Sequence, residues 1–444
     1  MARQYFGTDG VRGRVGEHPM TVDFALTLAS AAARVLAPNG GRVLIGKDTR
    51  VSGYMFESAL EAGFVAAGVD VMLIGPLPTP GVAYLTRRFE CSFGVVISAS
   101  HNPYDDNGIK FFDASGGKLS DELEARIEAE LEKGPVTCTS RNLGRATRVD
   151  KSRVRYQEFC ASTLPAGIDL EGLKVVLDCG NGACYKVGPR LLADLGAEIV
   201  PIGCSPNGRN INDGCGALAP ELLQLTVPGV RAAVGIAVDG DGDRLVMVDH
   251  LGRTVDGDQL LYVLALAHKR NGTLRGPVVG TVMSNLGLEL ALRREGIEFR
   301  RGPVGDRYVL GLMRESGSVL GGETSGHILV LDRTTTGDAL VSALQVLAEM
   351  VQTGRSLAEL AAGMSKFPQV LLNVRVAKRF DPTAIPRVDE AVRRIEKRLA
   401  EEGRVVLRPS GTEPVIRVMV EGRDEQTTRS CAAELAEIVR AEAG

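Results

Sequence analysis

The sequence has no excess of charge of either sign. Its 52 Lys and Arg residues nearly balance 55 Asp and Glu residues, which leaves a net charge of −3. Because no basic surplus creates an attractive field along the chain, we expect no nucleic-acid partner. Partners of such a chain should be small molecules.

Paired cysteines and long apolar runs are also missing. The eight cysteines are scattered and form no CxxC pair, which favours reduced thiols over a zinc site or a disulfide framework. The first residues contain no apolar segment typical of a signal peptide, and no apolar run reaches the roughly 18 residues that span a membrane. We therefore expect a cytoplasmic protein with no membrane partner.

Several familiar catalytic motifs are absent. The chain contains no G-x-x-x-x-G-K-[ST] phosphate loop, no G-x-G-x-x-G that opens a helix, no G-x-S-x-G and no H-E-x-x-H. Nucleotide-binding and serine hydrolase functions therefore lose their main support.

The chain does contain a repeat. A pattern of strand, helix, strand and strand begins near residues 42, 174 and 278, and each copy ends in a polar, glycine-rich loop. The part after residue 367 changes character, with an alternating strand followed by a charged amphipathic helix. We predict three repeated α/β domains with mixed sheets and a smaller C-terminal α+β domain. The predicted domains are 1–153, 154–254, 255–367 and 368–444.

The first repeat ends in the loop S-A-S-H-N-P at 98–103, directly after the apolar strand 93–97. Ser100 should be exposed at the carboxyl end of a strand, where open α/β sheets place their chemistry. Ser100 is then a candidate phosphate-carrying nucleophile, and His101 beside it is a candidate base. An ordinary turn fits the same residues equally well, so the choice between the two interpretations depends on the other loops.

The second repeat ends in Asp239, Asp241 and Asp243, separated by glycines that let the three carboxylates converge. Hard oxygen ligands in this arrangement suit Mg²⁺ or Ca²⁺. An EF-hand is rejected because Arg244 replaces the expected glycine and His250 replaces the closing glutamate. A metal is favoured over a solvated acidic turn because three unpaired carboxylates would repel one another.

The third repeat ends in a loop that suits a sugar. Glu323 and Ser325 can accept and donate hydrogen bonds to vicinal hydroxyls. His327 is a candidate for proton transfer, although a core histidine is the alternative. Lys110 carries the same ambiguity, because most lysines are solvated but this one follows the nucleophile by ten residues.

The C-terminal domain contributes R-P-S-G-T-E-P at 408–414, between two predicted strands. A guanidinium, two hydroxyls and inward-pointing amides form a nest for an anion, with Arg408 and Arg417 as phosphate ligands. A plain hairpin turn is the alternative, but such turns rarely need Arg, Ser and Thr together.

These four loops, in this order, resemble the α-D-phosphohexomutase superfamily across essentially the whole chain. Segments 5–13, 206–212 and 305–307 are similar to its phosphoglucosamine mutase branch. The resemblance implies three related domains and a fourth that closes over a central cleft. It also implies interconversion of glucosamine 6-phosphate and glucosamine 1-phosphate, on the route to UDP-N-acetylglucosamine and the bacterial cell wall.

The resemblance further implies a mechanism. Ser100 would be a phosphoserine, Mg²⁺ would bind Ser100 and the three aspartates, and a sugar 1,6-bisphosphate would be intermediate and activator. Lys110 and His327 would be general base and acid, with His101, Arg12 and Arg244 also in the catalytic centre. The implied substrate-binding residues are Glu323, Ser325, Asp306, Arg307, Arg408, Ser410, Gly411, Thr412 and Arg417.

Three other functions stay open at this point. The same chemistry on glucose or mannose phosphates would make the chain a phosphoglucomutase or phosphomannomutase. A non-catalytic sugar phosphate sensor and a metal-dependent phosphatase are further alternatives. The sequence also leaves the oligomeric state open, with a homodimer as one candidate.

Overall fold

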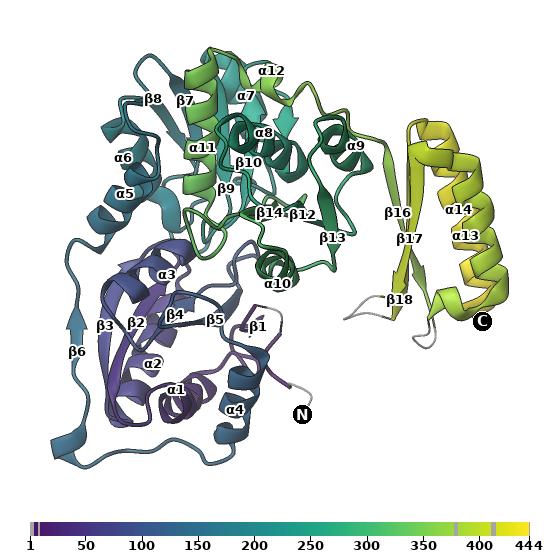
Figure 1. The fold of residues 1–444 in the computed structure, drawn as a ribbon. Helices are drawn as coiled ribbons and strands as arrows, with labels where there is room; N and C mark the ends of the chain where they lie inside the picture. The colour runs from purple at the N-terminus through teal and green to yellow at the C-terminus, as the bar shows by residue number, and fades with distance from the viewer. Residues whose placement is uncertain (1–3, 8, 377–380, 410–413, 444) are drawn as a thin grey trace.

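The computed structural model describes residues 4–7, 9–376, 381–409 and 414–443. Four β-sheets follow one another along the chain, and helices pack against each of them (Figure 1). The predicted fold class is therefore confirmed. Among the described residues, no helix combines the length and apolar character needed to cross a membrane.

The first sheet is built on buried apolar strands. Its order is β1 (Val11–Arg14), β5 (Asp106–Asp113), β4 (Phe93–Ile97), β2 (Gly41–Lys47), β3 (Val69–Pro76) and β6 (Ala146–Arg148). Strand β4 is buried along its whole length, as expected for a parallel strand with helices on both faces. Its helices are α1 (Val22–Leu36), α2 (Ser52–Ala66), α3 (Thr79–Arg88) and α4 (Asp121–Leu131).

The second sheet repeats this plan. Its order is β11 (Thr254–Val255), β10 (Leu245–Asp249), β9 (Val234–Val238), β7 (Lys174–Asp178) and β8 (Glu198–Ile202). Strands β7, β8 and β9 are parallel, and β10 returns antiparallel to β9. The accompanying helices are α5 (Ser152–Ser162), α6 (Val187–Asp194) and α7 (Glu221–Gly229).

The third sheet has the order β13 (Phe299–Gly302), β12 (Val278–Thr281), β14 (Leu320–Gly322) and β15 (Ile328–Val330). Its helices are α8 (Gly257–Arg270), α9 (Leu286–Arg294), α10 (Asp306–Ser316), α11 (Ala339–Thr353) and α12 (Leu357–Ala361). In all three sheets, one loop joins the third parallel strand of the repeat to its antiparallel neighbour. These loops are the three that the sequence singled out.

Each repeat also contains a helix that the sequence pattern did not predict. Helices α3, α7 and α10 lie between the second and third strands of their repeats, so the predicted strand, helix, strand, strand order was incomplete. Pro80 and Gly81 stand in the first turn of α3, and Pro228 lies inside α7. These residues are typical of turns in sequence, although proline is tolerated in a first helical turn.

The first three domains share packing, whereas the C-terminal domain has its own core. One apolar cluster runs from Leu44 in β2 through Leu177 in β7 to Leu320 in β14. The C-terminal sheet packs separately against its own two helices, through residues such as Ile416 and Leu435. It consists of β16 (Gln369–Arg375), β18 (Val415–Gly422) and β17 (Gly403–Pro409), with α13 (Pro386–Leu399) and α14 (Glu425–Ala443).

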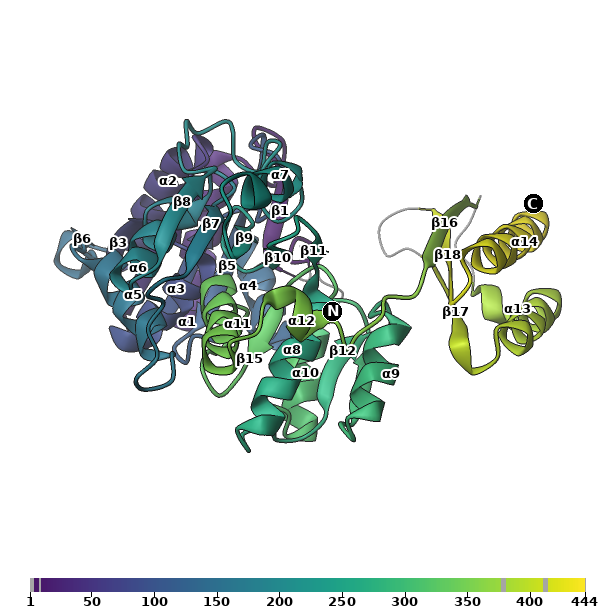
Figure 2. The ribbon, with the colours of Figure 1, turned by 90° about the horizontal axis from the view of Figure 1, so that it is seen from above.

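The C-terminal domain stands to one side of the other three (Figures 1 and 2). Its Arg404 donates hydrogen bonds to the carbonyl oxygens of Val282 and Ser284 in the third domain, at 2.9 and 2.5 Å. Glu421 accepts the amide of Leu286 at 3.0 Å. These contacts attach the C-terminal domain at the start of α9.

Candidate functional site

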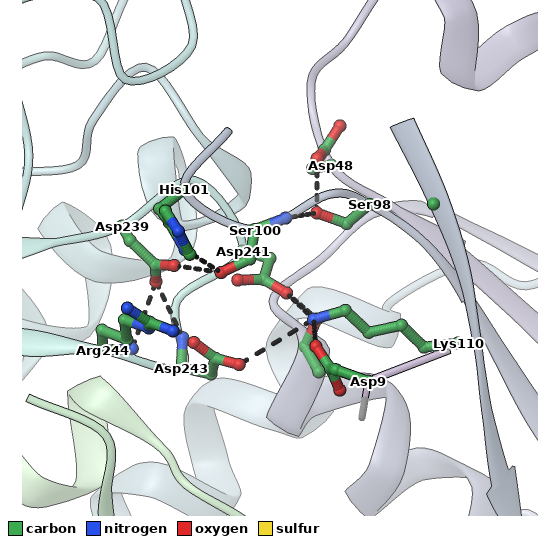
Figure 3. Close-up of polar contacts among 12 residues, drawn as sticks. Asp9, Asp48, Ser98, Ser100, His101, Lys110, Asp239, Asp241, Asp243 and Arg244 are labelled. Atoms are coloured by element: carbon green, nitrogen blue, oxygen red, sulfur yellow. Dashed lines mark hydrogen bonds and ion pairs between the residues drawn. The ribbon is translucent and has the colours of Figure 1, made fainter. Parts of the chain in front are cut away.

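The loops of the first and second repeats meet at Ser100. Its Oγ donates a hydrogen bond to Oδ2 of Asp239 at 2.6 Å (Figure 3). Ser100 is only 1% exposed, so the prediction that it is an exposed residue was wrong. The strand end is covered because the aspartate loop of the second domain packs on it: a Cβ on Gly240 would come within 2.7 Å of the Ser100 carbonyl oxygen.

The three aspartates form a site suited to a divalent cation. One carboxylate oxygen from each of Asp239, Asp241 and Asp243 lies within 4.8 Å of the others, and all three residues are buried. Burial, and then the charges of Asp243 and Asp241, raise the pKa of Asp239 well above its ordinary value. Within the described part of the chain, the buried Oδ1 atoms of Asp241 and Asp243 have no hydrogen-bond partner. Clustered carboxylates with free oxygens are the donors that hard cations prefer.

Lys110 supplies the nearest positive charge to these carboxylates. Its Nζ lies 2.7 Å from Asp241 Oδ2 and 2.8 Å from Asp9 Oδ2. Burial alone would lower the pKa of Lys110, but the charges of Asp241 and Asp9 outweigh it and raise the pKa above its ordinary value. Lys110 is therefore a cation in this arrangement.

Two arginines, Arg12 and Arg244, add further positive charge near the three aspartates. Arg12 pairs with Asp9, and the backbone amide of Arg244 donates to Asp239 Oδ1 at 3.1 Å. The Nε atoms of both guanidinium groups are buried and find no hydrogen-bond partner among the residues that the structure describes. Buried donors without a partner are costly, so these two suit a bound anion.

His101 lies beside Ser100 in space as well as in sequence. Its Nδ1 is 3.4 Å from Ser100 Oγ. Burial, followed by the charges of Arg244 and Arg12, lowers the pKa of His101 to about 4. The imidazole is therefore neutral near pH 7 and is able to accept a proton.

His327 is buried in the same region and is held between two carboxylates. Its Nδ1 is 3.7 Å from Asp243 Oδ2, and its Nε2 is 3.6 Å from Asp306 Oδ2. Burial opposes the charge on the ring, but Asp243 and Asp306 together raise the pKa of His327 to about 8. His327 is therefore charged at neutral pH.

A closed ring of alternating charges links these groups across three domains. Lys118 Nζ contacts Asp306 and lies 2.5 Å from Asp9, which itself contacts Lys110. Lys110 also forms an ion pair with Asp241 of the aspartate loop, and Asp243 of the same loop pairs with His327. The ring consists of Asp9, Lys110, Asp243, His327, Asp306 and Lys118.

Three other predicted site residues, Glu323, Arg307 and Ser325, do not belong to this ring of charges. Glu323 Oε1 accepts the amide of Gly305 at 2.8 Å, which places it at the start of α10. Arg307 turns toward α4, where its guanidinium bonds Glu124 at 2.5 and 3.0 Å and also contacts Asp121. Ser325 lies in the same loop as His327, between β14 and β15.

The predicted phosphate residues of the C-terminal domain form a separate group. Arg408 and Arg417 are direct cross-strand partners on β17 and β18, and that sheet stands apart from β4, the strand that precedes the Ser100 loop (Figure 1). Burial, followed by the charge of Arg417, lowers the pKa of Arg408. Ser410, Gly411 and Thr412 lie outside the described residues.

Sequence reasoning missed several residues of the site. Asp9 and Lys118 connect the first and third domains, as described above. Thr79, at the start of α3, donates from Oγ1 to Asp241 Oδ2 at 2.6 Å. An acidic residue inside the glycine-rich start of the chain was a usable signal for Asp9, whereas Thr79 and Lys118 have no local signature.

The chain matches four domain models of one family, each described as part of phosphoglucomutase/phosphomannomutase. Alpha/beta/alpha domain I matches residues 3–136, domain II 155–252, domain III 256–367, and the C-terminal domain 371–438. The matches follow the four sheets in order along the chain.

Curated relatives match over their whole length. A phosphoglucosamine mutase of Aeromonas hydrophila is 58% identical over 440 residues, covering 99% of this chain and 99% of the relative. One from Thioalkalivibrio sulfidiphilus is 60% identical over 444 residues, covering 99% and 98%.

Solved structures share the fold. A phosphoglucomutase/phosphomannomutase family protein from Burkholderia thailandensis has a TM-score of 0.81 at 23% identity, covering 99% of this chain and 98% of that one. N-acetylphosphoglucosamine mutase of Aspergillus fumigatus, in complex with GlcNAc-6P and magnesium, has a TM-score of 0.71 at 18% identity, covering 100% and 96%.

Proposed function

The chain belongs to the phosphoglucosamine mutase branch of the phosphoglucomutase/phosphomannomutase family, and on this premise we propose that it interconverts glucosamine 6-phosphate and glucosamine 1-phosphate through phosphorylated Ser100. The chain is thus an isomerase that moves a phosphoryl group between two positions of one sugar. The observation that carries the proposal is the 2.6 Å contact between Ser100 Oγ and Asp239, inside the carboxylate cluster.

Asp239, Asp241 and Asp243 would hold Mg²⁺ together with an oxygen of the Ser100 phosphoryl group, and the cation would supply charge neutralisation there. The buried Nε donors of Arg12 and Arg244 would supply the same kind of stabilisation from the protein. Phosphoryl transfer depends mainly on such positioning and neutralisation, which is why one serine can give and retrieve the group.

Each half-reaction breaks one phosphorus–oxygen bond and forms another. The sugar hydroxyl attacks the phosphoryl group on Ser100, its proton passes to a base, and Ser100 Oγ receives a proton as it leaves. Lys110 and His327 are the proposed proton carriers, and both are protonated in this arrangement, so the one that acts as base must lose its proton before the sugar hydroxyl attacks. His327, with a pKa of about 8, loses it more readily than Lys110, whose pKa is raised, and Lys110 is then the group that protonates Ser100 Oγ. The sugar 1,6-bisphosphate formed then reverses end for end and returns its other phosphoryl group to Ser100.

The remaining predicted residues would hold the sugar in both orientations. Glu323 and Ser325 would bind hydroxyl groups that look alike from either end of the ligand. The phosphate group that is not transferred would be bound by Arg408, Ser410, Gly411, Thr412 and Arg417. Asp306 and Arg307 are proposed as further substrate-binding residues. A phosphoenzyme open to water would hydrolyse, so the C-terminal domain must swing toward the other three during the reaction.

The proposal includes a cytoplasmic location on the route to UDP-N-acetylglucosamine. All eight cysteines are free thiols, which suits a reducing compartment. The proposed partners are small sugar phosphates, and the proposed assembly is a homodimer.

The test is intact-mass analysis of the protein before and after treatment with glucose 1,6-bisphosphate and Mg²⁺. One phosphoryl group should map to Ser100, and Ser100→Ala should carry none and lose mutase activity. The exposed Ser115 gives a matched control, Ser115→Ala, which should behave as wild type. Full activity of Ser100→Ala would sink the proposal, as would a wild-type chain that cannot be phosphorylated.

The same assay separates the alternatives. Turnover of glucosamine 6-phosphate should exceed that of the glucose and mannose phosphates, whereas the reverse order would make the chain a phosphoglucomutase or phosphomannomutase. Release of inorganic phosphate in place of an isomerised sugar would identify a phosphatase. Binding of sugar phosphates without turnover would identify a sensor.

A further inference from the structure

The backbone of Ser100 is held by side chains on both sides of the residue. Its N–H donates to Oγ of Ser98 at 2.9 Å, and Ser98 in turn donates to Asp48 at 2.5 Å (Figure 3). Its carbonyl oxygen accepts Nη2 of Arg50 at 3.0 Å and Nδ2 of Asn212 at 2.9 Å. Both peptide groups that flank the nucleophile are therefore fixed.

Arg50 is buried completely, and its contacts are with this loop and its neighbour Asp48. Its Nη2 also donates to the carbonyl oxygen of Asn102 at 2.8 Å, and its Nε lies 3.2 Å from Asp48. A buried guanidinium is costly unless its donors are used, and its planar fork fixes the direction of each bond. The burial of Arg50 is therefore favourable only when residues 100–102 keep the conformation that accepts its hydrogen bonds.

Asn212 reaches the same two carbonyl oxygens from the second domain. Its Nδ2 donates to the carbonyl of Ser100 and, at 3.2 Å, to that of Asn102. Asn212 has a φ of 57°, a left-handed conformation that asparagine tolerates better than most residues. The second domain thus supplies the carboxylate that meets Ser100 Oγ and also a clamp on the Ser100 backbone.

Ser100 itself needs such a clamp. Its φ is 53°, in the left-handed region that a serine rarely adopts. Residues held in such conformations persist only where the surroundings over-determine them, and they cluster at functional sites. If the carbonyl were released, the loop would relax toward negative φ and Oγ would turn away from Asp239.

We propose that Arg50 and Asn212 are positioning residues for phosphoryl transfer: together they clamp the Ser100 carbonyl and so aim Oγ at the Asp239 carboxylate. The inference rests on the proposed function, in which Ser100 carries the phosphoryl group. Neither residue touches the reacting atoms, so each acts through the backbone of Ser100.

The main test replaces Asn212, which is half-buried, whereas Arg50 is completely buried. Asn212→Asp keeps size and tolerance for positive φ but removes both donors, and Asn212→Gly removes them without adding a charge. Each should slow transfer of a phosphoryl group from glucose 1,6-bisphosphate to Ser100 by about 100-fold, as expected for misplacement near 1 Å. The KM for glucosamine 6-phosphate should change less than about threefold, because no sugar contact is lost.

Hydrogen exchange gives a readout independent of turnover. Amides in the 98–103 segment should exchange faster in both Asn212 variants than in the wild-type protein, while the melting temperature stays within a few degrees. Arg50→Lys keeps the charge and one donor nitrogen in place of three, so it should lose less transfer rate than Arg50→Ala. The matched control is Asn210→Asp in the same loop, which loses a bond to the carbonyl of Ser205 and should behave as wild type.

The outcomes separate this inference from the proposed function. A wild-type chain that cannot phosphorylate Ser100 or isomerise glucosamine phosphates would overturn the proposed function. A competent wild type with unchanged transfer rates in Asn212→Asp and Asn212→Gly would overturn the clamp alone. Equal losses in the Asn210→Asp control, or a loss carried entirely by KM, would also overturn it.

Discussion

Ser100 Oγ and Asp239 Oδ2 lie 2.6 Å apart, although 139 positions separate the two residues in the chain. Each stands in the loop that follows the third parallel strand of its repeat. The two repeats therefore face each other through equivalent loops, one with a hydroxyl and the other with carboxylates. This relationship converts two unremarkable strand ends into a single site.

The carboxylate cluster predicts opposite effects with and without a divalent cation. Asp239→Asn should raise the melting temperature of the metal-free protein at pH 7.5, because it removes a buried carboxylate whose pKa is raised by burial and by Asp243 and Asp241. The same change should weaken Mg²⁺ binding roughly tenfold or more. Calorimetric titration and melting curves in EDTA measure both effects.

Asp213, which is exposed on a loop of the same domain, provides the control for that experiment. Asp213→Asn should leave Mg²⁺ binding and the metal-free melting temperature unchanged. An Asp239→Asn protein that still binds Mg²⁺ with wild-type affinity would show that the three carboxylates are not the metal site.

The pKa of His327 predicts a pH-dependent stability of the metal-free protein. The folded value of about 8 exceeds the ordinary 6.5, so the contribution is complete below about pH 6.5 and is lost as the pH rises through 8. The buried ring contributes at most about 2 kcal/mol in this way. Denaturant unfolding of wild type and His327→Gln between pH 6 and 9, in EDTA, measures the difference.

The exposed His250 is the reference position for this comparison. His250→Gln should keep the wild-type pH profile, while His327→Gln flattens it between pH 6.5 and 8. A wild-type profile that rises across this interval relative to His327→Gln would contradict the assignment of His327 as a cation held by Asp243 and Asp306.

The ion pair between Arg307 and Glu124 predicts a measurable coupling between the first and third domains. Arg307→Ala should lower the free energy of unfolding by about 2 kcal/mol, because the Glu124 side chain is only 5% exposed and would lose a paired cation. The double variant with Glu124→Gln should be less destabilised than the sum of the two single variants. Additive losses would show that the pair contributes nothing.

KM values of these variants also test the substrate-binding role predicted for Arg307. A rise in KM shared by Arg307→Ala and Glu124→Gln would come from the loosened domain contact. A rise confined to Arg307→Ala would indicate direct contact with substrate, which requires the guanidinium to leave α4. The two results are distinguishable in one steady-state experiment.

The phosphate-binding role proposed for Arg408 predicts that its removal weakens substrate binding. Arg408→Ala should raise the KM for glucosamine 6-phosphate about 10- to 100-fold, the cost of losing one charge-assisted phosphate contact. Arg423→Ala is the control, because Arg423 pairs with Glu402 on the exposed rim of the same domain. An unchanged KM in Arg408→Ala would place the phosphate grip elsewhere.

The strand-end loops could be predicted from sequence because their chemistry is local. Three aspartates separated by glycines can converge within one short loop, and Ser100 follows an apolar strand that is readable as buried. The fold class was predictable for the same reason, since each repeat carries its own strand pattern. The helix α3 was missed because a Pro-Gly pair in its first turn resembles a loop.

The supporting groups could not be predicted because they act across domains. Nothing near Lys118 in sequence indicates a carboxylate partner, and Asp306 reaches it only after the third domain has packed on the first. Ser100 was wrongly predicted to be exposed for the same reason, because it is Gly240 of another repeat that packs on it. Interdomain packing, rather than local propensity, decides these contacts.

The ring of charges has a consequence for dissecting the molecule. Asp9, Lys110 and Lys118 come from the first repeat, Asp243 from the second, and His327 and Asp306 from the third. A fragment that contains the first repeat alone would leave two ammonium groups to share one carboxylate. A single repeat therefore cannot form the ring of charges. If the chain were split between the repeats, the ring would form again only when all three pieces reassociate.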